Sequence, residues 1–153
     1  MIDIDLSNQQ SQYPIDAARL VSAARRVLEG EGVRAGSLSI AVVDDRTIHD
    51  LNRRYLQHDY PTDVLSFLLD SRPGQWGGEV VVSADTAAAR CGDYGWSLQD
   101  ELLLYVIHGL LHLAGYDDDA PEPQAAMRRR EHHYLGQFGL TPRYDAGGEE
   151  AVP

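Results

Sequence analysis

The feature that most constrains the fold is an alternation of strand-like and helix-like segments along the chain. Residues 38–43 and 79–83 are short apolar runs rich in β-branched residues, which are typical of buried strands. Residues 1–6 alternate apolar and acidic side chains, and the apolar residues between Pro14 and Gly30 recur at helical spacing. Strands separated by helices lie parallel, because a parallel connection needs a crossover. We therefore predict an α/β (α+β) protein with a mixed, partly parallel sheet.

The remaining segments complete this prediction of about four strands and about five helices. Asp44 and Asp45 cap a second helix, residues 63–69 form a strand, residues 71–78 form a loop, and a short helix covers residues 85–90. A long helix opens at Ser97 with acids near the positive end of its dipole, and stops before Gly115. A final helix follows Pro121 and runs to residue 136.

The length of 153 residues fits one domain, and residues 1–144 contain neither an internal repeat nor a linker. Residues 145–153 lack periodicity and carry Gly, acids and Pro, so we expect a flexible acidic tail there. No basic segment precedes an apolar run at the N-terminus, and the longest apolar stretch, residues 102–107, is too short to span a bilayer. The single cysteine, Cys91, fits a reducing compartment. We expect a cytoplasmic protein with no membrane partner.

The charge balance argues against nonspecific binding to nucleic acid. The chain carries 24 acidic and 13 basic residues, for a net charge of −11, and phosphate contacts need Lys or Arg. All the basic residues are arginines, clustered at positions 25–26, 53–54 and 128–130, where solvated helix faces are the more usual explanation. No DNA partner is expected. An RNA substrate would require Arg53, Arg54, Arg72 and residues 128–130 to line one groove.

The clearest chemical signal is a pair of histidines near the end of the long helix. His108 and His112 are four residues apart, so they project from one helix face and are able to share one ion, for which imidazole suits zinc and its neighbours. Gly115 then turns the chain back and offers Asp117, Asp118 or Asp119 as a third ligand. The alternative is a pair of surface histidines followed by acids that cap the next helix.

The residue after His108 excludes one class of metal enzyme. Zinc peptidases of the HExxH type carry their general base at the second position of that motif. This chain has Gly109 there, so it lacks that mechanism.

The run His108-Gly-Leu-Leu-His-Leu-Ala-Gly-Tyr-Asp resembles the HGxLHLxGYDH signature of the bacterial YbeY family, whose members are single-strand-specific metallo-endoribonucleases linked to ribosomal RNA maturation. Met127 and Glu131 match the acid-rich helix that follows in the family. Residues 51–55, 61–67 and 78–83 are similar to the family's LNxxYR, PTDVLSF and G-D/E-IVIS elements. The resemblance covers roughly positions 1–140, in the same order.

The resemblance implies a metal-dependent hydrolase that cleaves phosphodiesters in single-stranded RNA, in 16S rRNA 3′-end maturation and ribosome quality control. Its implied partners are single-stranded RNA and ribosomal RNA or a ribosomal subunit. The third histidine of the signature is Asp118 here, and carboxylate is a competent zinc ligand. We therefore predict His108, His112 and Asp118 as ligands of Zn²⁺, with Asp119 as the rival ligand. Mn²⁺ and Fe²⁺ are alternatives because of the carboxylate.

The catalytic groups are less clearly indicated. Leu56 stands where the family has a functionally important arginine, so we predict that the neighbouring Arg54 stabilises charge on the phosphorus. Asp117 is predicted to accept a proton or to orient a ligand histidine, with Glu79 as another candidate base. Two other functions stay open: a metal hydrolase of another substrate, and a non-catalytic ribosome-associated binding protein, which Leu56 and Asp118 would explain.

Two tryptophans complete the sequence predictions. Trp76 and Trp96 are expected in loops, where an anchoring role is more usual than stacking on a nucleic-acid base.

Overall fold

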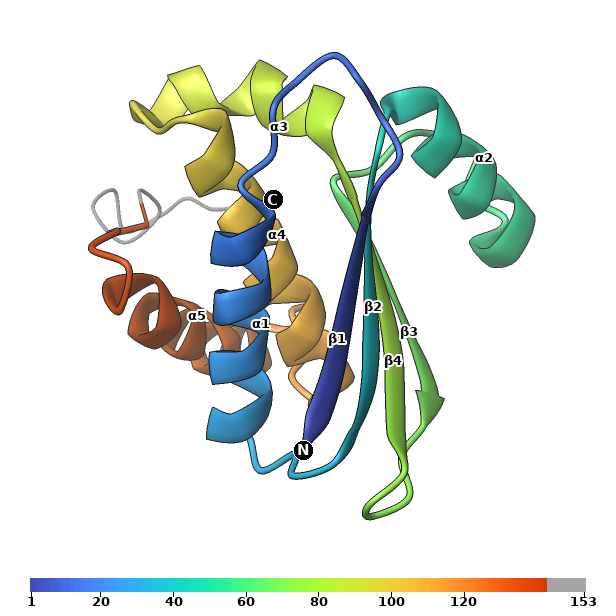
Figure 1. Ribbon diagram of the computed structural model, residues 1–153. Coiled ribbons are helices and arrows are strands. Elements are labelled where there is room, and N and C mark those ends of the chain that lie inside the picture. The colour runs from blue at the N-terminus through green and yellow to red at the C-terminus, as the bar shows by residue number, and fades with distance from the viewer. Residues whose placement is uncertain (143–153) are drawn as a thin grey trace.

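Four strands and five α-helices form residues 1–142, the part of the chain that the computed structural model describes (Figure 1). The elements are β1 Ile2–Asn8, α1 Ala17–Gly30, β2 Gly36–Val43, α2 Asp45–Leu56, β3 Val64–Asp70, β4 Trp76–Ser83, α3 Ala84–Cys91, a 3₁₀ turn Gly92–Tyr94, α4 Leu98–Leu113 and α5 Pro121–Gly136. The predicted tail, residues 145–153, lies outside the described residues. That residues 1–144 form one domain stays a prediction.

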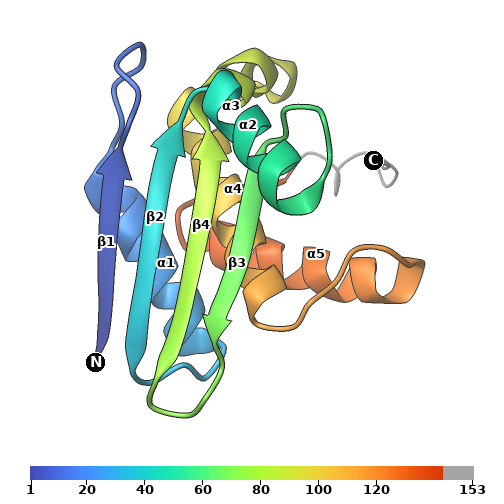
Figure 2. The same ribbon diagram turned by 90° about the vertical axis from the view of Figure 1, so that its right-hand side faces the viewer.

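The sheet has the strand order β1-β2-β4-β3 (Figure 2). The strands β1, β2 and β4 are parallel, whereas β3 runs antiparallel to β4. The predicted mixed, partly parallel sheet is thus confirmed. The antiparallel strands β3 and β4 form a hairpin. β3 lies at the edge of the sheet, next to the C-terminal half of α4.

The prediction that residues 71–78 form a loop is wrong at its end, because β4 already begins at Trp76. Gly77 and Gly78 pair with both neighbouring strands. A Cβ on Gly78 would lie 2.6 Å from the ring of Trp76 and 2.9 Å from Leu113. Gly78 therefore allows the indole and α4 to approach the strand closely, and neither glycine marks a turn.

Helices cover both faces of the sheet, with α1, α4 and α5 on one side and α2 on the other (Figure 1). The central helix is α4, which is apolar around most of its circumference, as a fully surrounded helix must be. Six of its side chains are completely buried: Leu102, Leu103, Val106, Ile107, Leu110 and Leu111. Each such side chain contributes about 1.5–3 kcal/mol through burial. Side chains at the end of α4 are therefore carried by a helix that is anchored in the core of the fold.

The predicted caps Asp44 and Ser97 are confirmed, whereas Asp45 is the first residue of α2 and its carboxylate accepts hydrogen bonds from Ser83 and Thr86 instead. The Asp44 carboxylate accepts a hydrogen bond from the Thr47 amide at 2.8 Å, and Ser97 forms a reciprocal capping box with Asp100 at the start of α4. Within residues 1–142, no helix is both long and apolar enough to cross a bilayer.

Candidate metal centre

The two histidines of the motif lie in the last two turns of α4. His108 and His112 project from the same face, and their ring centroids are 4.8 Å apart at an interplanar angle of 80°. The opposite faces of this helix are buried, so the imidazoles are the polar part of an otherwise apolar helix end. Both rings are partly exposed to solvent, which leaves them accessible to an ion.

The chain reverses directly after these histidines. Gly115 adopts a φ of 106°, its amide donates to the His112 carbonyl at 3.0 Å, and the Tyr116 amide donates to the Leu111 carbonyl at 3.0 Å. This pair of bonds is a Schellman ending, which needs a residue that tolerates positive φ. The reversal brings Asp118 back over the two rings, as the Gly115 signal predicted.

The carboxylate of Asp118 faces both imidazoles. Its Oδ2 lies 3.5 Å from His108 Nε2, and its Oδ1 lies 3.7 Å from His112 Nε2. Asp117 is not one of the three donors; its Oδ1 accepts the Asp118 amide at 2.8 Å and so fixes the backbone of that residue. The structure thus brings together the three predicted ligands and favours Asp118 over Asp119.

The donor atoms of these three residues fit a first-row transition ion. They all lie within 4.8 Å of one another. In a tetrahedral site with bonds of about 2.1 Å, two ligand atoms lie about 3.4 Å apart. The distances from the two Asp118 oxygens, each to one imidazole nitrogen, are within a few tenths of an ångström of that value, and rotation of the side chains would bring the rest of the donor group to it. Two imidazoles and one carboxylate also leave a coordination position open for water or substrate.

A buried carboxylate holds the first of these histidines in place. His108 Nδ1 lies 2.5 Å from Glu131 Oε2 on α5, and Glu131 is 3% exposed. Burial lowers the pKa of His108, but the hydrogen bond and the charge of Glu131 outweigh that effect, so the pKa is raised. The same bond directs Nε2 toward Asp118, which is the usual role of a carboxylate behind a metal-binding histidine.

The orienting role of Glu131 was not predicted from the sequence, in which the residue only matches a family motif. A signal was present, because the buried residues of α5 are Met127, Glu131, Tyr134 and Leu135. Glu131 thus occupies a core position of the helical stripe, where a charged residue almost always has a partner.

A second acid ties the loop of Asp118 to the rest of the fold. Glu31, at the end of α1, accepts hydrogen bonds from Tyr116 at 3.0 Å, from Arg130 at 2.8 Å and from Tyr134 at 2.6 Å. Burial raises the pKa of Glu31, but the hydrogen bonds from these three residues outweigh it and lower the pKa. The cluster joins α1, α5 and the turn after α4, and it holds the turn that carries the third ligand.

The absence of a side chain at Gly109 is explained by the close packing around it. A Cβ at this position would lie 3.0 Å from Val64 Cγ2 and 3.1 Å from Val80 Cγ1. The missing side chain lets α4 pack closely on β3 and β4. A glutamate, as in HExxH enzymes, has no room at this position.

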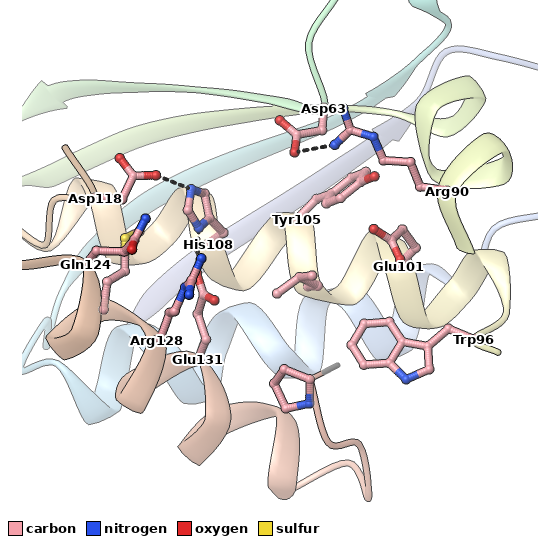
Figure 3. Close-up of a pocket in the computed structure, with 13 residues that line it drawn as sticks. Asp63, Arg90, Trp96, Glu101, Tyr105, His108, Asp118, Gln124, Arg128 and Glu131 are labelled. Carbon is pink, nitrogen blue, oxygen red and sulfur yellow. Dashed lines mark hydrogen bonds and ion pairs between the residues drawn. The ribbon is translucent and has the colours of Figure 1, made fainter. Parts of the chain in front are cut away.

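Two cavities meet at the candidate metal centre. The α5 cavity, of about 450 Å³, lies between α4 and α5 and is shown in Figure 3. The α2 cavity, of about 650 Å³, lies beside the end of α2 and β3, and its lining includes Leu56, Tyr60 and Ser66. His108, Asp118 and Asp63 line both cavities. A chain-like ligand that crosses the metal centre would therefore find a hollow on either side.

The α5 cavity contains two buried polar groups on α4 that the sequence analysis did not single out. Glu101 and Tyr105 are 2% and 3% exposed, and burial raises the pKa of both. Trp96, expected in a loop, precedes α4 and lines the same cavity, whereas Trp76 is buried in β4. A glutamate one turn before a tyrosine, in an otherwise apolar helix, was the available signal.

The charge balance set a condition for an RNA substrate, that the clustered arginines line one groove, and this condition is not met, which counts against RNA on the ground of charge. Arg53 and Arg54 both pair with Asp50 on α2, at 2.7 and 2.8 Å, and within residues 1–142 neither belongs to the lining of the two cavities. Arg72 pairs with Asp70 on the β3–β4 hairpin, and Arg130 is bound in the Glu31 cluster. These side chains therefore lie on three separate elements, and each is paired with an acid.

The positive charges beside the metal centre are different ones. Arg128 of α5 and Arg90 of α3 line the α5 cavity, and Arg90 pairs with Asp63 at 3.2 Å. Arg90 was not considered in the sequence analysis. Its position at the end of a short helix gave no sign that the fold brings it next to α4.

Comparison with known proteins agrees with this geometry. Residues 5–139 match the family model described as endoribonuclease YbeY. Relatives named endoribonuclease YbeY include one from Rhodopirellula baltica, 48% identical over 79% of this chain and 63% of its own length, and one from Pelotomaculum thermopropionicum, 42% identical over 89% of this chain and 97% of its own length.

A solved structure shows the same fold. The solution structure of a Thermotoga maritima protein covers 98% of this chain and 97% of its own, with a TM-score of 0.58 and 24% identity. The match over residues 5–139 and the relatives named endoribonuclease YbeY identify the family of this chain. They also identify it as a hydrolase, because a nuclease is a hydrolase. The chain belongs to the YbeY family of endoribonucleases.

Proposed function

We propose that this endoribonuclease is metal-dependent and hydrolyses single-stranded RNA, in 16S rRNA 3′-end maturation and ribosome quality control in the cytoplasm. The observation that carries the proposal is the convergence of His108, His112 and Asp118 where two cavities meet. The proposed partners are single-stranded RNA and ribosomal RNA or a ribosomal subunit, with neither DNA nor a membrane.

His108, His112 and Asp118 would hold Zn²⁺, with Mn²⁺ or Fe²⁺ as alternatives. When bound, such an ion supplies an activated water at neutral pH and a Lewis acid for the phosphoryl oxygen. Glu131 keeps the His108 ring oriented, and Asp117 holds the backbone of Asp118. Asp117 also stays our proposed proton acceptor, because its carboxylate lies next to the ligand turn.

The shape of the site favours an unpaired strand. Bases of a single strand are free to turn out of the stack and enter separate hollows, whereas those of a duplex are not. In the α2 cavity the ring of Tyr60, 53% exposed, stacks on His58 with a centroid distance of 5.4 Å and an interplanar angle of 9°. Exposed aromatic faces of this kind are platforms for unpaired bases.

We assign the role of stabilising the phosphate charge to Arg128, which lines the α5 cavity beside His108. An arginine there would stabilise negative charge that develops on the phosphorus. Arg54 stays a proposed contributor, but it would have to exchange Asp50 for RNA. With a net charge of −11, attraction of the whole protein to RNA contributes little, so binding rests on these local contacts.

Cleavage assays test the proposal directly. The zinc-loaded chain is incubated with an RNA of the 16S 3′-precursor sequence, single-stranded or annealed to its complement. We expect cleavage of the single strand alone, loss of cleavage in Asp118→Ala, and retention in the matched control Asp119→Ala. A metal-loaded protein that leaves all RNA intact would indicate another substrate. Equal cleavage by Asp118→Ala would remove that residue from the site.

A further inference from the structure

We propose that the α5 cavity is a subsite for one RNA base, and that it selects bases with an exocyclic amino group (adenine, cytosine or guanine) over uracil. The inference rests on the proposed function, since the base is part of the RNA strand at the metal centre. It goes further because it assigns a base preference and names Glu101 and Tyr105 as the residues that set it.

The position of the cavity suits the nucleoside next to the cleaved bond. His108 and Asp118 line it, so a phosphate held at the metal centre leaves the adjoining nucleoside at its mouth. Figure 3 shows Tyr105 and Glu101 following His108 along α4, with Trp96 at the far end. Glu101, Tyr105 and His108 lie on one face because they are spaced four and three residues apart.

Two buried polar atoms in this cavity lack a well-formed hydrogen bond. Within residues 1–142, neither Glu101 Oε1 nor the Tyr105 hydroxyl makes a hydrogen bond of good geometry, although both residues are at least 97% buried. Their remaining interactions are with each other and with Arg90. Leaving such groups unsatisfied is costly, and almost all buried polar groups in proteins are paired. Their placement side by side on the cavity wall indicates that a ligand supplies the missing partners.

The chemistry of these atoms decides which base fits. A carboxyl oxygen accepts hydrogen bonds in either protonation state, and a phenol both donates and accepts. An exocyclic amino group donates to Glu101, and the Tyr105 hydroxyl donates to a neighbouring ring nitrogen or carbonyl of the same base. Uracil has no amino group, and its single N–H lies between two carbonyl oxygens, which would face the carboxyl oxygens of Glu101.

The rest of the cavity suits a flat aromatic ligand. Trp96, Leu104 and Met127 supply apolar lining, and an indole is a good surface on which a base stacks. The volume of about 450 Å³ is within the range of small-molecule sites, about 300–1,000 Å³. Arg128 and Gln124 of α5 border the cavity next to His108 and Asp118, where the sugar and phosphate would lie (Figure 3).

Binding measurements test the subsite apart from catalysis. The zinc-loaded full chain is titrated into fluorescent hexanucleotides that resist hydrolysis because they carry 2′-O-methyl and phosphorothioate groups. One hexamer contains adenine and its partner contains purine riboside, which lacks only the amino group. We expect adenine to bind about tenfold more tightly, the discrimination of one good pair of hydrogen bonds. Cytosine and uracil hexamers form a second pair with the same expected order.

Three variants assign the preference to the named residues. Glu101→Leu and Tyr105→Phe should reduce the adenine preference to within about twofold, with Glu101→Leu melting at a higher temperature because an unpaired buried carboxyl is removed. The matched control is Tyr134→Phe, another buried tyrosine, whose hydroxyl is bonded to Glu31. It should lower the melting temperature and keep the base preference.

The outcomes separate this inference from the proposed function. Tight RNA binding by the wild type without base preference overturns the subsite alone, as does an unchanged preference in Glu101→Leu and Tyr105→Phe. Failure of the wild type to bind any hexamer overturns both. A tenfold preference that both variants abolish and Tyr134→Phe retains establishes the subsite.

Discussion

The substitution Glu131→Gln tests how the fold prepares the metal centre. Glu131 is 3% exposed and bonds to His108 Nδ1 at 2.5 Å, so it directs the other ring nitrogen toward Asp118. Glutamine keeps the size of the side chain and removes its charge. Loss of the carboxylate behind a ligand histidine lowers metal affinity about 10–100-fold, which equals about 1.4–2.7 kcal/mol.

The same loss has a thermal consequence. In excess zinc, the ion stabilises the fold in proportion to the logarithm of its affinity, so the variant loses about 1.4–2.7 kcal/mol of that stabilisation. For a chain of this length, 1 kcal/mol shifts Tm by about 2–4 °C. The gain in Tm on adding zinc should therefore be smaller in Glu131→Gln than in the wild type by about 3–11 °C.

Calorimetric zinc titrations and thermal melts with and without zinc measure both quantities. The difference between the melts removes any effect of the substitution on the metal-free fold. Asp119→Asn is the matched control, because it makes the same carboxylate-to-amide change on the ligand loop outside the donor group. Wild-type zinc affinity in Glu131→Gln would refute the orienting role of Glu131.

Three further predictions concern stability. The pKa of His108 is raised in the folded state, so the charged ring stabilises the metal-free protein fully below the unfolded pKa of about 6.5. This stabilisation is lost as the pH rises through the folded pKa. In chelator, the melting temperature should therefore fall more steeply with rising pH in the wild type than in Glu131→Gln. Gly109→Ala crowds two valines at 3.0 and 3.1 Å and should cost about 1–3 kcal/mol in urea unfolding; an unchanged midpoint would contradict the close packing. Tyr134→Phe removes a 2.6 Å bond to Glu31 and should cost about 1–3 kcal/mol, whereas equal stability would show that the cluster is dispensable.

Much of the fold could be predicted because its signals are local. The caps Asp44 and Ser97 and the helix-ending Gly115 each act within a few residues, and the structure confirms them. The start of β4 was missed because Gly77 and Gly78 usually weaken a strand. Gly78 belongs in β4 because an indole and α4 pack against it, which no local pattern contains.

In the candidate metal centre, too, local features could be predicted from the sequence and long-range contacts could not. The spacing of His108 and His112 and the turn at Gly115 predict two ligands and a third from Asp117, Asp118 or Asp119, because these features lie within one helix and its end; the resemblance to the family signature then selects Asp118. Glu131 acts on a residue 23 positions away, and its partner depends on how α5 crosses α4. The arginines on α2 were misjudged although their signal was local, because Asp50 lies three and four residues before Arg53 and Arg54 and pairs with both.

The central claim is that His108, His112 and Asp118 hold one catalytic ion. Elemental analysis of the purified protein, wild type and Asp118→Ala, tests it most directly. We predict about one equivalent of zinc or a similar ion in the wild type and its loss in the variant, with Asp119→Ala unchanged. A folded wild type that binds no metal after incubation with zinc, or an Asp118→Ala variant that keeps its full equivalent, would contradict the account.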